Sequence, residues 1–149
     1  MNHSLRTAVD IDAPASVVWD VLVDLDAYAE WNPFIVSATG AVAVGERLTN
    51  RLEPPGGRGM TFKPTITELT EGRVLEWLGR AGIPGIFDGR HRFELTDVDG
   101  RTRLEHSEAF FGILVPFMRG SLDTHTLKGF EAMNAALRER AEARVRTTS

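Results

Sequence analysis

The sequence predicts an α+β fold in which a curved antiparallel sheet of seven strands wraps around one long C-terminal helix. Three observations lead to this prediction. Strand-like alternation runs through the middle of the chain, the connections between these strands are too short for helical crossovers, and apolar residues recur at helical spacing near the end. One helix can cover so broad an apolar sheet face only if the sheet curls around it.

The chain begins with a predicted strand at Leu5–Ile11, where every second residue is apolar or a threonine. Asp12 is expected to cap a short helix with Pro14 in its first turn, where the missing N–H of proline costs nothing. Asp24 is expected to cap a second short helix. This helix must stop before Pro33, because the residue preceding a proline avoids the helical conformation.

Six further strands are predicted in the middle of the chain, and glycine or proline residues lie in most of the connections between them. The predicted ranges are Phe34–Thr39, Glu46–Glu53, Met60–Leu69, Arg73–Gly79, Phe87–Val98 and Arg101–Phe111. The last two strands meet at Asp99-Gly100, a dipeptide typical of a two-residue hairpin turn.

A final helix is predicted from Pro116 to about Ala143, because apolar residues and one threonine recur at spacings of three or four positions. These residues are Met118, Leu122, Thr126, Phe130, Met133, Leu137 and Ala141. At roughly 1.5 Å per residue the helix would span on the order of 40 Å, the width of a small domain. No linker or internal repeat interrupts the chain, so residues 1–149 are predicted to form a single domain.

Composition and charge narrow the function classes. The chain has 149 residues, no cysteine and a formal net charge of −4. A disulfide, a thiolate nucleophile and a sulfur-ligated metal are excluded, and a cytoplasmic location is expected. The basic residues are scattered, which argues against nucleic-acid binding. No apolar segment approaches the roughly 20 residues of a membrane span, so no stable membrane insertion is expected.

Two histidines and a glutamate lie on the apolar face of the last two predicted strands. His91, His106 and Glu108 alternate there with phenylalanine and leucine residues. Polar groups on such a face must be paired, hydrated or available to a ligand, so a lined cavity is the first hypothesis.

Two hairpin registers remain open from the sequence. A two-residue turn at Asp99-Gly100 places His91 opposite Glu108. A loop shifted by one residue places His91 opposite His106 and pairs opposite charges on the outer face of the sheet. In both registers the two histidines and the glutamate come within reach of one another.

Glu108 and a histidine can act as a general acid/base pair that removes a proton next to a ketone, as in aldol cyclisation or dehydration. The same groups can instead orient a ligand or satisfy one another, and this interpretation is preferred, so no residue is firmly assigned to catalysis. Two histidines and a carboxylate can also bind zinc or iron. Their spacing matches no metal-site motif, and no metal or cofactor is expected.

The residues predicted to bind a ligand in this cavity come from most parts of the fold. They are Trp31, Phe34, Phe62, Trp77, Phe87, His91, Phe93, His106, Glu108, Phe110, Met118, Leu122 and Phe130. The Gly79–Gly85 segment is the preferred candidate for a mobile lid, and the Pro54–Gly59 loop is the second. Gly129 is expected to serve close packing more than cavity space, and His125 is expected at the surface.

The order of elements and four segments resemble the START/Bet v 1-like (SRPBCC) superfamily, and within it the bacterial polyketide cyclase/dehydrase-like proteins. The segments are Asp12–Pro14 with Val18-Trp19, Tyr28–Phe34, Pro84–Phe93 and Gly129–Asn134. The resemblance extends from Ser4 to about Ala143. It implies a helix-grip fold with a deep cavity for lipids, polyketides or other hydrophobic molecules.

The resemblance does not imply catalysis, because the superfamily uses one scaffold for carriers, sensors and cyclases. The first hypothesis is therefore binding or transport of a hydrophobic small molecule, lipid or polyketide-like, between the sheet and the C-terminal helix. A polyketide cyclase or dehydratase is the alternative, and a partner-binding module with an exposed apolar surface is the third. The oligomeric state stays open between monomer and homodimer.

Overall fold

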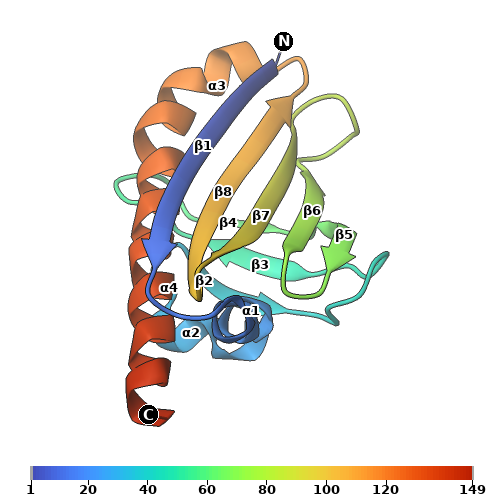
Figure 1. Cartoon of the computed structure of the whole chain (residues 1–149). Helices are drawn as coiled ribbons and strands as arrows, with labels where there is room; N and C mark the ends of the chain where they lie inside the picture. Colours follow the sequence, from blue (N-terminus) through green and yellow to red (C-terminus); the bar gives the residue numbers. More distant parts are fainter. Residues whose placement is uncertain (1, 149) are drawn as a thin grey trace.

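The computed structural model describes residues 2–148, which form eight strands in two antiparallel sheets and a long C-terminal helix (Figure 1). The larger sheet has the order β1 (Asn2–Ile11), β8 (Arg101–Phe111), β7 (Asp88–Val98), β6 (Val74–Arg80) and β5 (Thr65–Thr70). The smaller sheet consists of β2 (Ile35–Thr39), β3 (Thr49–Leu52) and β4 (Met60–Phe62). The α+β helix-grip architecture is confirmed.

The strand count differs from the prediction, because the single strand expected at Met60–Leu69 is two strands. The break falls at Pro64, which has no N–H to donate to a sheet. The Pro64 carbonyl instead accepts a hydrogen bond from the backbone N–H of Leu48 at 2.7 Å. The chain passes from the smaller sheet to the larger sheet at this point, and an isolated bridge joins Arg47, just before β3, to Thr65 at the start of β5.

Two short helical segments follow β1, of which the first packs against β7 and β8 of the larger sheet and the second against β2 of the smaller sheet. They are α1 (Ala15–Val23) and a 3₁₀ turn, η1 (Leu25–Ala27), that leads into α2 (Tyr28–Trp31). Asp12 does not cap α1 as expected. The residue at the cap position is Pro14, and its carbonyl accepts the N–H groups of Val17 and Val18 at 3.0 and 3.1 Å.

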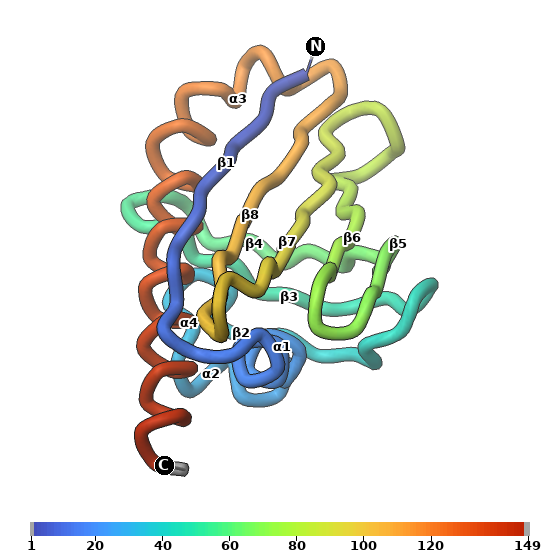
Figure 2. The backbone as a smooth tube through the Cα atoms, in the orientation of Figure 1, coloured from blue at the N-terminus to red at the C-terminus, as the bar shows by residue number. Residues whose placement is uncertain are grey.

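The C-terminal helix runs without a break from Val115 to Thr148, beyond the predicted end at about Ala143, and lies alongside β1 (Figures 1 and 2). It comprises α3 (Val115–Ser121), a π-helical turn η2 (Leu122–Thr126) and α4 (Leu127–Thr148). The π turn was not predicted, since its extra residue leaves the apolar spacing nearly intact. Within residues 2–148 no helix is long and apolar enough to cross a membrane.

The core packs between the helix and the concave face of the sheets. Phe34 and Phe130 lie at its centre with ring centroids 5.6 Å apart. A side chain at Gly129 would overlap the ring of Phe34. Gly129 therefore allows close packing of the helix, as expected, and does not open space for a ligand.

The hairpin between β7 and β8 uses a two-residue turn. Asp99 and Gly100 have φ values of 54° and 83°, the left-handed conformation that this turn requires at both positions. His91 consequently lies opposite Glu108, and the shifted register that paired His91 with His106 is wrong.

The outer face of the sheet explains why charge pairing did not set the register. Glu94 and Glu105 lie opposite each other, although they carry like charges. Arg92 finds its partners elsewhere, at Glu76 and Glu68, with N–O distances of 2.6 and 2.9 Å. Exposed ion pairs contribute little, so turn geometry and burial of the inner face determine the register.

Candidate functional site

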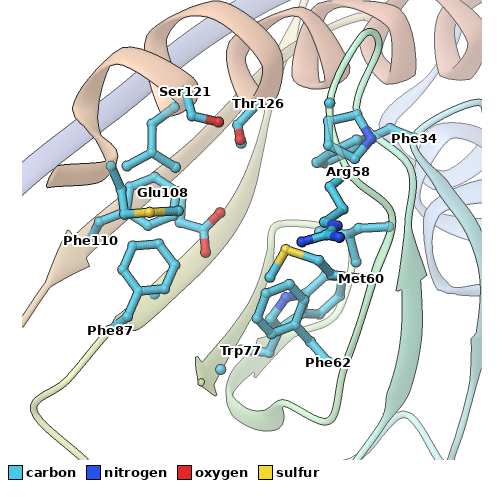
Figure 3. Close-up of a pocket in the computed structure, with 17 residues that line it drawn as sticks. Phe34, Arg58, Met60, Phe62, Trp77, Phe87, Glu108, Phe110, Ser121 and Thr126 are labelled. Atoms are coloured by element: carbon cyan, nitrogen blue, oxygen red, sulfur yellow. The ribbon is translucent and has the colours of Figure 1, made fainter. Parts of the chain in front are cut away.

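A largely apolar cavity of about 230 Å³ lies between the larger sheet, the β3–β4 connection and the C-terminal helix (Figure 3). This volume is somewhat below the roughly 300–1,000 Å³ of typical small-molecule sites. The cavity is lined by Phe34, Leu52, Pro54, Gly57, Arg58, Met60, Phe62, Trp77, Gly79, Phe87, Gly89, Glu108, Phe110, Met118, Ser121, Leu122 and Thr126.

Many of the residues predicted to bind a ligand line this cavity. They are Phe34, Phe62, Trp77, Phe87, Glu108, Phe110, Met118 and Leu122. The others, Trp31, His91, Phe93, His106 and Phe130, are not among the lining residues. Apart from Trp31, which packs edge-on against Tyr28, these residues form the core directly behind the cavity wall.

The two histidine rings are sandwiched between aromatic side chains. His106 stacks on Phe130 with a centroid distance of 4.1 Å and an interplanar angle of 6°, and on Phe93 at 4.4 Å. His91 stacks on Trp77 at 5.1 Å. Both histidines are buried, so their ring nitrogens need partners within the protein.

These partners form a chain of hydrogen bonds that starts at the cavity wall. Oε1 of Glu108 lies 3.1 Å from Nδ1 of His91, and Nε2 of His91 lies 2.7 Å from Nε2 of His106. Nδ1 of His106 lies 2.8 Å from Oδ1 of Asn134 on α4. Sequence patterns did not predict Asn134 as a site residue. The only signal for it is an amide in the otherwise apolar stripe that contains Met133.

Thr7 fixes the orientation of the Asn134 amide. The Thr7 hydroxyl donates its single proton to the backbone carbonyl of His106 at 2.8 Å. It must therefore accept at its other contact, where Nδ2 of Asn134 donates to it at 2.8 Å. The amide oxygen of Asn134 then faces His106 and accepts the hydrogen of Nδ1.

His106 is consequently a neutral ring with its proton on Nδ1. Burial and the adjacent His91 hold the pKa of His106 well below its usual range, although the Asn134 hydrogen bond opposes this shift. Nε2 of His106 is then an acceptor, and it must take the hydrogen of Nε2 of His91.

One proton remains for the hydrogen bond between His91 and Glu108. It lies either on Nδ1 of His91, as an imidazolium–carboxylate pair, or on Glu108, beside a neutral imidazole. The pair has no net charge in either case. Glu108 is the member that reaches the cavity, where its carboxylate points toward the open space (Figure 3).

Gly89 on β7 makes room for this carboxylate. A Cβ atom at Gly89 would overlap Oε2 of Glu108. Gly89 itself lines the cavity, and its missing side chain lets Glu108 lie across the neighbouring strand. Within residues 2–148 no three His, Asp or Glu side chains are grouped as metal ligands.

The cavity has three further polar lining residues, Arg58, Ser121 and Thr126. Ser121 and Thr126 flank or end the π turn, whose wider helical step brings both to the same side as Leu122. Ser121 and Thr126 were not predicted as ligand contacts, because helical spacing alone does not reveal a π turn, and Arg58 was not predicted because it lies in a loop without periodicity.

The two loops proposed as lids differ in their placement. The Pro54–Gly59 loop contributes Pro54, Gly57 and Arg58 to the cavity wall, whereas the Gly79–Gly85 segment contributes only Gly79. His125 is partly buried against the first loop, and its Nδ1 donates to the Pro55 carbonyl at 3.1 Å.

Comparison of the sequence with family models identifies a family that covers most of the chain. Residues 2–142 match the model described as polyketide cyclase / dehydrase and lipid transport. A search of curated protein sequences found no match.

Solved structures with the same fold cover nearly the whole chain. The Zhui aromatase/cyclase from Streptomyces sp. R1128 has a TM-score of 0.83 at 20% identity, with 100% of this chain and 99% of that chain covered. TTHA0849 from Thermus thermophilus has a TM-score of 0.76 at 15% identity, with 95% and 99% covered. Ara h 8.0201 has a TM-score of 0.64 at 14% identity, with 92% and 98% covered. At these identities the likeness establishes a shared fold.

Proposed function

Since this chain belongs to the polyketide cyclase/dehydrase and lipid transport family, within the START/Bet v 1-like superfamily, we propose that it binds a hydrophobic small molecule in the cavity between the sheet and the C-terminal helix. The observation that supports this most directly is a cavity whose wall is built mainly from aromatic and aliphatic side chains. A ligand that buries about 200 Å² of apolar surface there gains about 5 kcal/mol, before the entropic cost of association is subtracted.

A neutral fluorescent naphthylamine, N-phenyl-1-naphthylamine, tests this proposal, because its emission rises when it leaves water for an apolar site. We expect saturable binding with one site per chain. Replacing the lining residue Met118 with tryptophan fills the cavity and should weaken binding at least tenfold.

The neighbouring residue provides a matched control. Phe117 lies on the same helix, is 83% exposed and does not line the cavity. Phe117→Trp should bind the naphthylamine like the wild type. Equal binding by Met118→Trp and the wild type, or no binding by either, would reject the cavity as a ligand site.

A second function, cyclisation with loss of water, is favoured by the proton held between Glu108 and His91. In a substrate with several ketones, ionised Glu108 removes a proton from the methylene between two carbonyl groups. The resulting enolate carbon bonds to a more distant carbonyl carbon and closes the ring, and the oxygen of that carbonyl takes the proton back from the His91–Glu108 pair. Glu108 then removes the second proton of the same methylene carbon, and the pair passes this proton to the new hydroxyl group. The hydroxyl leaves as one water, and a conjugated double bond forms in the ring. No outside oxidant or reductant is needed.

Glu108→Gln separates the two functions. As a catalyst the variant should lose turnover of a soluble polyketone, followed by the absorbance of the conjugated product, while the affinity for the substrate stays within about threefold of wild type. As a carrier it should change affinity alone. Glu105→Gln, an exposed residue on the same strand, is the matched control and should leave both quantities unchanged.

We further propose a cytoplasmic location, which the lack of cysteine supports and cell fractionation would test. The net charge of −4 supports the absence of a nucleic-acid partner.

The third hypothesis, a partner-binding module, has one observation in its favour. Ile83, Ile113, Leu114 and Phe117 are exposed on two segments that are joined by the hydrogen bond from Ile113 N–H to the Gly85 carbonyl. Light scattering would show whether this surface associates with a second copy.

A further inference from the structure

We propose that the cavity selects hydrophobic molecules that carry an anionic group, and that Arg58 is the residue that recognises this group. This inference rests on the proposed ligand-binding function and names the chemical class of the ligand. It is carried by the position of Arg58, by its lack of a partner and by the net charge of the cavity.

Arg58 belongs to the connection between β3 and β4 and lines the cavity, although its side chain is exposed. Within residues 2–148 it makes no ion pair and no side-chain hydrogen bond. Arg51, near the start of the same connection, is in contrast paired with Glu53 at 3.7 Å. The guanidinium of Arg58 thus keeps all its hydrogen-bond donors for solvent or a ligand.

The charge balance of the cavity gives Arg58 its significance. Of the described residues that line the cavity, two are charged, Arg58 and Glu108. Glu108 shares one proton with His91, so that pair is neutral as a whole. The cavity therefore carries one uncompensated positive charge, and an anion is the complementary ligand group.

The two charged residues lie on opposite walls and are not paired with each other. Figure 3 shows Arg58 on the wall that carries Met60, Phe62 and Trp77, while Glu108 projects from the other side. A ligand that places its apolar body against the aromatic residues can direct an acidic group to the guanidinium. Carboxylate, sulfonate and phosphate groups all match the paired donors of arginine.

The loop that carries Arg58 is held against the helix. Nδ1 of His125 donates to the Pro55 carbonyl, and the backbone at Gly57 lies against the His125 ring. Figure 2 shows this connection passing beside the C-terminal helix. Arg58 is therefore presented by an anchored loop, which lowers the entropic cost of holding it over a bound anion.

Two fluorescent molecules that differ by one anionic group test the inference. N-phenyl-1-naphthylamine is neutral, and 8-anilinonaphthalene-1-sulfonate carries the same ring system with a sulfonate. Arg58→Gln should weaken binding of the sulfonate about fivefold, the upper limit for an exposed ion pair, and should leave the neutral molecule within about twofold.

Three controls define the result. Arg119→Gln removes an exposed arginine of the C-terminal helix that does not line the cavity, and it should change neither affinity. Raising the salt concentration should weaken sulfonate binding to the wild type more than to Arg58→Gln. Met118→Trp should abolish the sulfonate signal, which shows that the dye occupies the cavity rather than the surface.

The outcomes separate this inference from the proposed function. Failure of both molecules to bind the wild type overturns the proposed function and the inference with it. Binding of the neutral molecule together with an equal effect of Arg58→Gln on both molecules, or no effect on either, leaves the cavity as a ligand site and overturns the role of Arg58. A selective loss of the sulfonate supports both.

Discussion

At the scale of single residues, the site depends on Thr7 and Asn134, which never reach the cavity. Asn134 accepts the hydrogen of Nδ1 of His106, and this leaves Nε2 of His106 as an acceptor for His91. The proton count at Glu108 is therefore determined by a threonine and an amide on the far side of the histidine pair. The aromatic residues around the imidazoles exclude water, which would otherwise compete for the hydrogen bonds of the ring nitrogens.

The pH dependence of stability should report on His106. Its pKa is lowered in the folded state, so the unfolded chain binds a proton more readily below about pH 6.5. The contribution of His106 is fully present above that pH and is lost as the pH falls. We expect the free energy of unfolding to drop by up to about 1.4 kcal/mol per pH unit between pH 6.5 and 5 from this group.

Urea denaturation at a series of pH values checks this expectation, with His106→Gln as the comparison. The variant should have a shallower slope over the same window, whatever its overall stability. Equal slopes for the two proteins would show that His106 takes up its proton as easily in the folded state as in the unfolded chain.

Gly89→Ala should disturb Glu108 directly. The added methyl overlaps the carboxylate, and the resulting shift should cost about 1–3 kcal/mol in the free energy of unfolding. A double-mutant cycle measures the specific part. In the Glu108→Ala background the same change at Gly89 should cost much less, and additive effects would contradict the contact.

At the scale of elements, the C-terminal helix has two glycines with opposite environments. Gly129 lies against the ring of Phe34, whereas nothing lies near a Cβ atom added at Gly120. The π turn lies between them and brings Ser121 and Thr126 to the cavity. The helix therefore packs closely against the core at Gly129, whereas Ser121 and Thr126 form part of the cavity wall.

Alanine at each glycine tests this contrast. Gly120→Ala should stabilise the protein by about 1 kcal/mol, because alanine favours a helix more than glycine does. Gly129→Ala should destabilise it by about 1–3 kcal/mol, because the buried Phe34 ring must move. Thermal or urea unfolding of the two variants measures the difference, and changes of the same sign would contradict the packing.

At the scale of the whole molecule, binding in the cavity is coupled to folding. The cavity wall is assembled from the larger sheet, the β3–β4 connection and the C-terminal helix, so the site exists only when all of them are in place. A ligand that binds there must stabilise the folded chain by mass action.

Thermal unfolding with the neutral naphthylamine measures this coupling. At 100 times its dissociation constant the ligand should add about 2.7 kcal/mol to the stability, which corresponds to a rise in Tm of roughly 5–10 °C for a chain of this length. Met118→Trp should show little or no rise. A rise of the same size in Met118→Trp would place the binding site elsewhere.

Local patterns in the sequence were sufficient to predict most of the fold. Alternation on β7 and β8 predicted the inner face that carries His91, His106 and Glu108, and their proximity is confirmed. Asp99-Gly100 predicted the turn, because that turn needs two left-handed residues. The strand predicted at Met60–Leu69 is in fact two strands. Pro64 indicates this break, because proline has no N–H to donate to a sheet, and the prediction did not take it into account.

The amino-acid order alone was enough to place aromatic residues and a His/Glu cluster on one face, because period-two alternation is a local property of a strand. Only the folded structure shows that Glu108 reaches the cavity, whereas His91 and His106 lie buried behind its wall. It also shows that Asn134 and Thr7 orient the cluster and that Arg58 lies unpaired at the cavity wall. Those relations join residues from distant parts of the chain, and such contacts form only when the sheet closes on the helix.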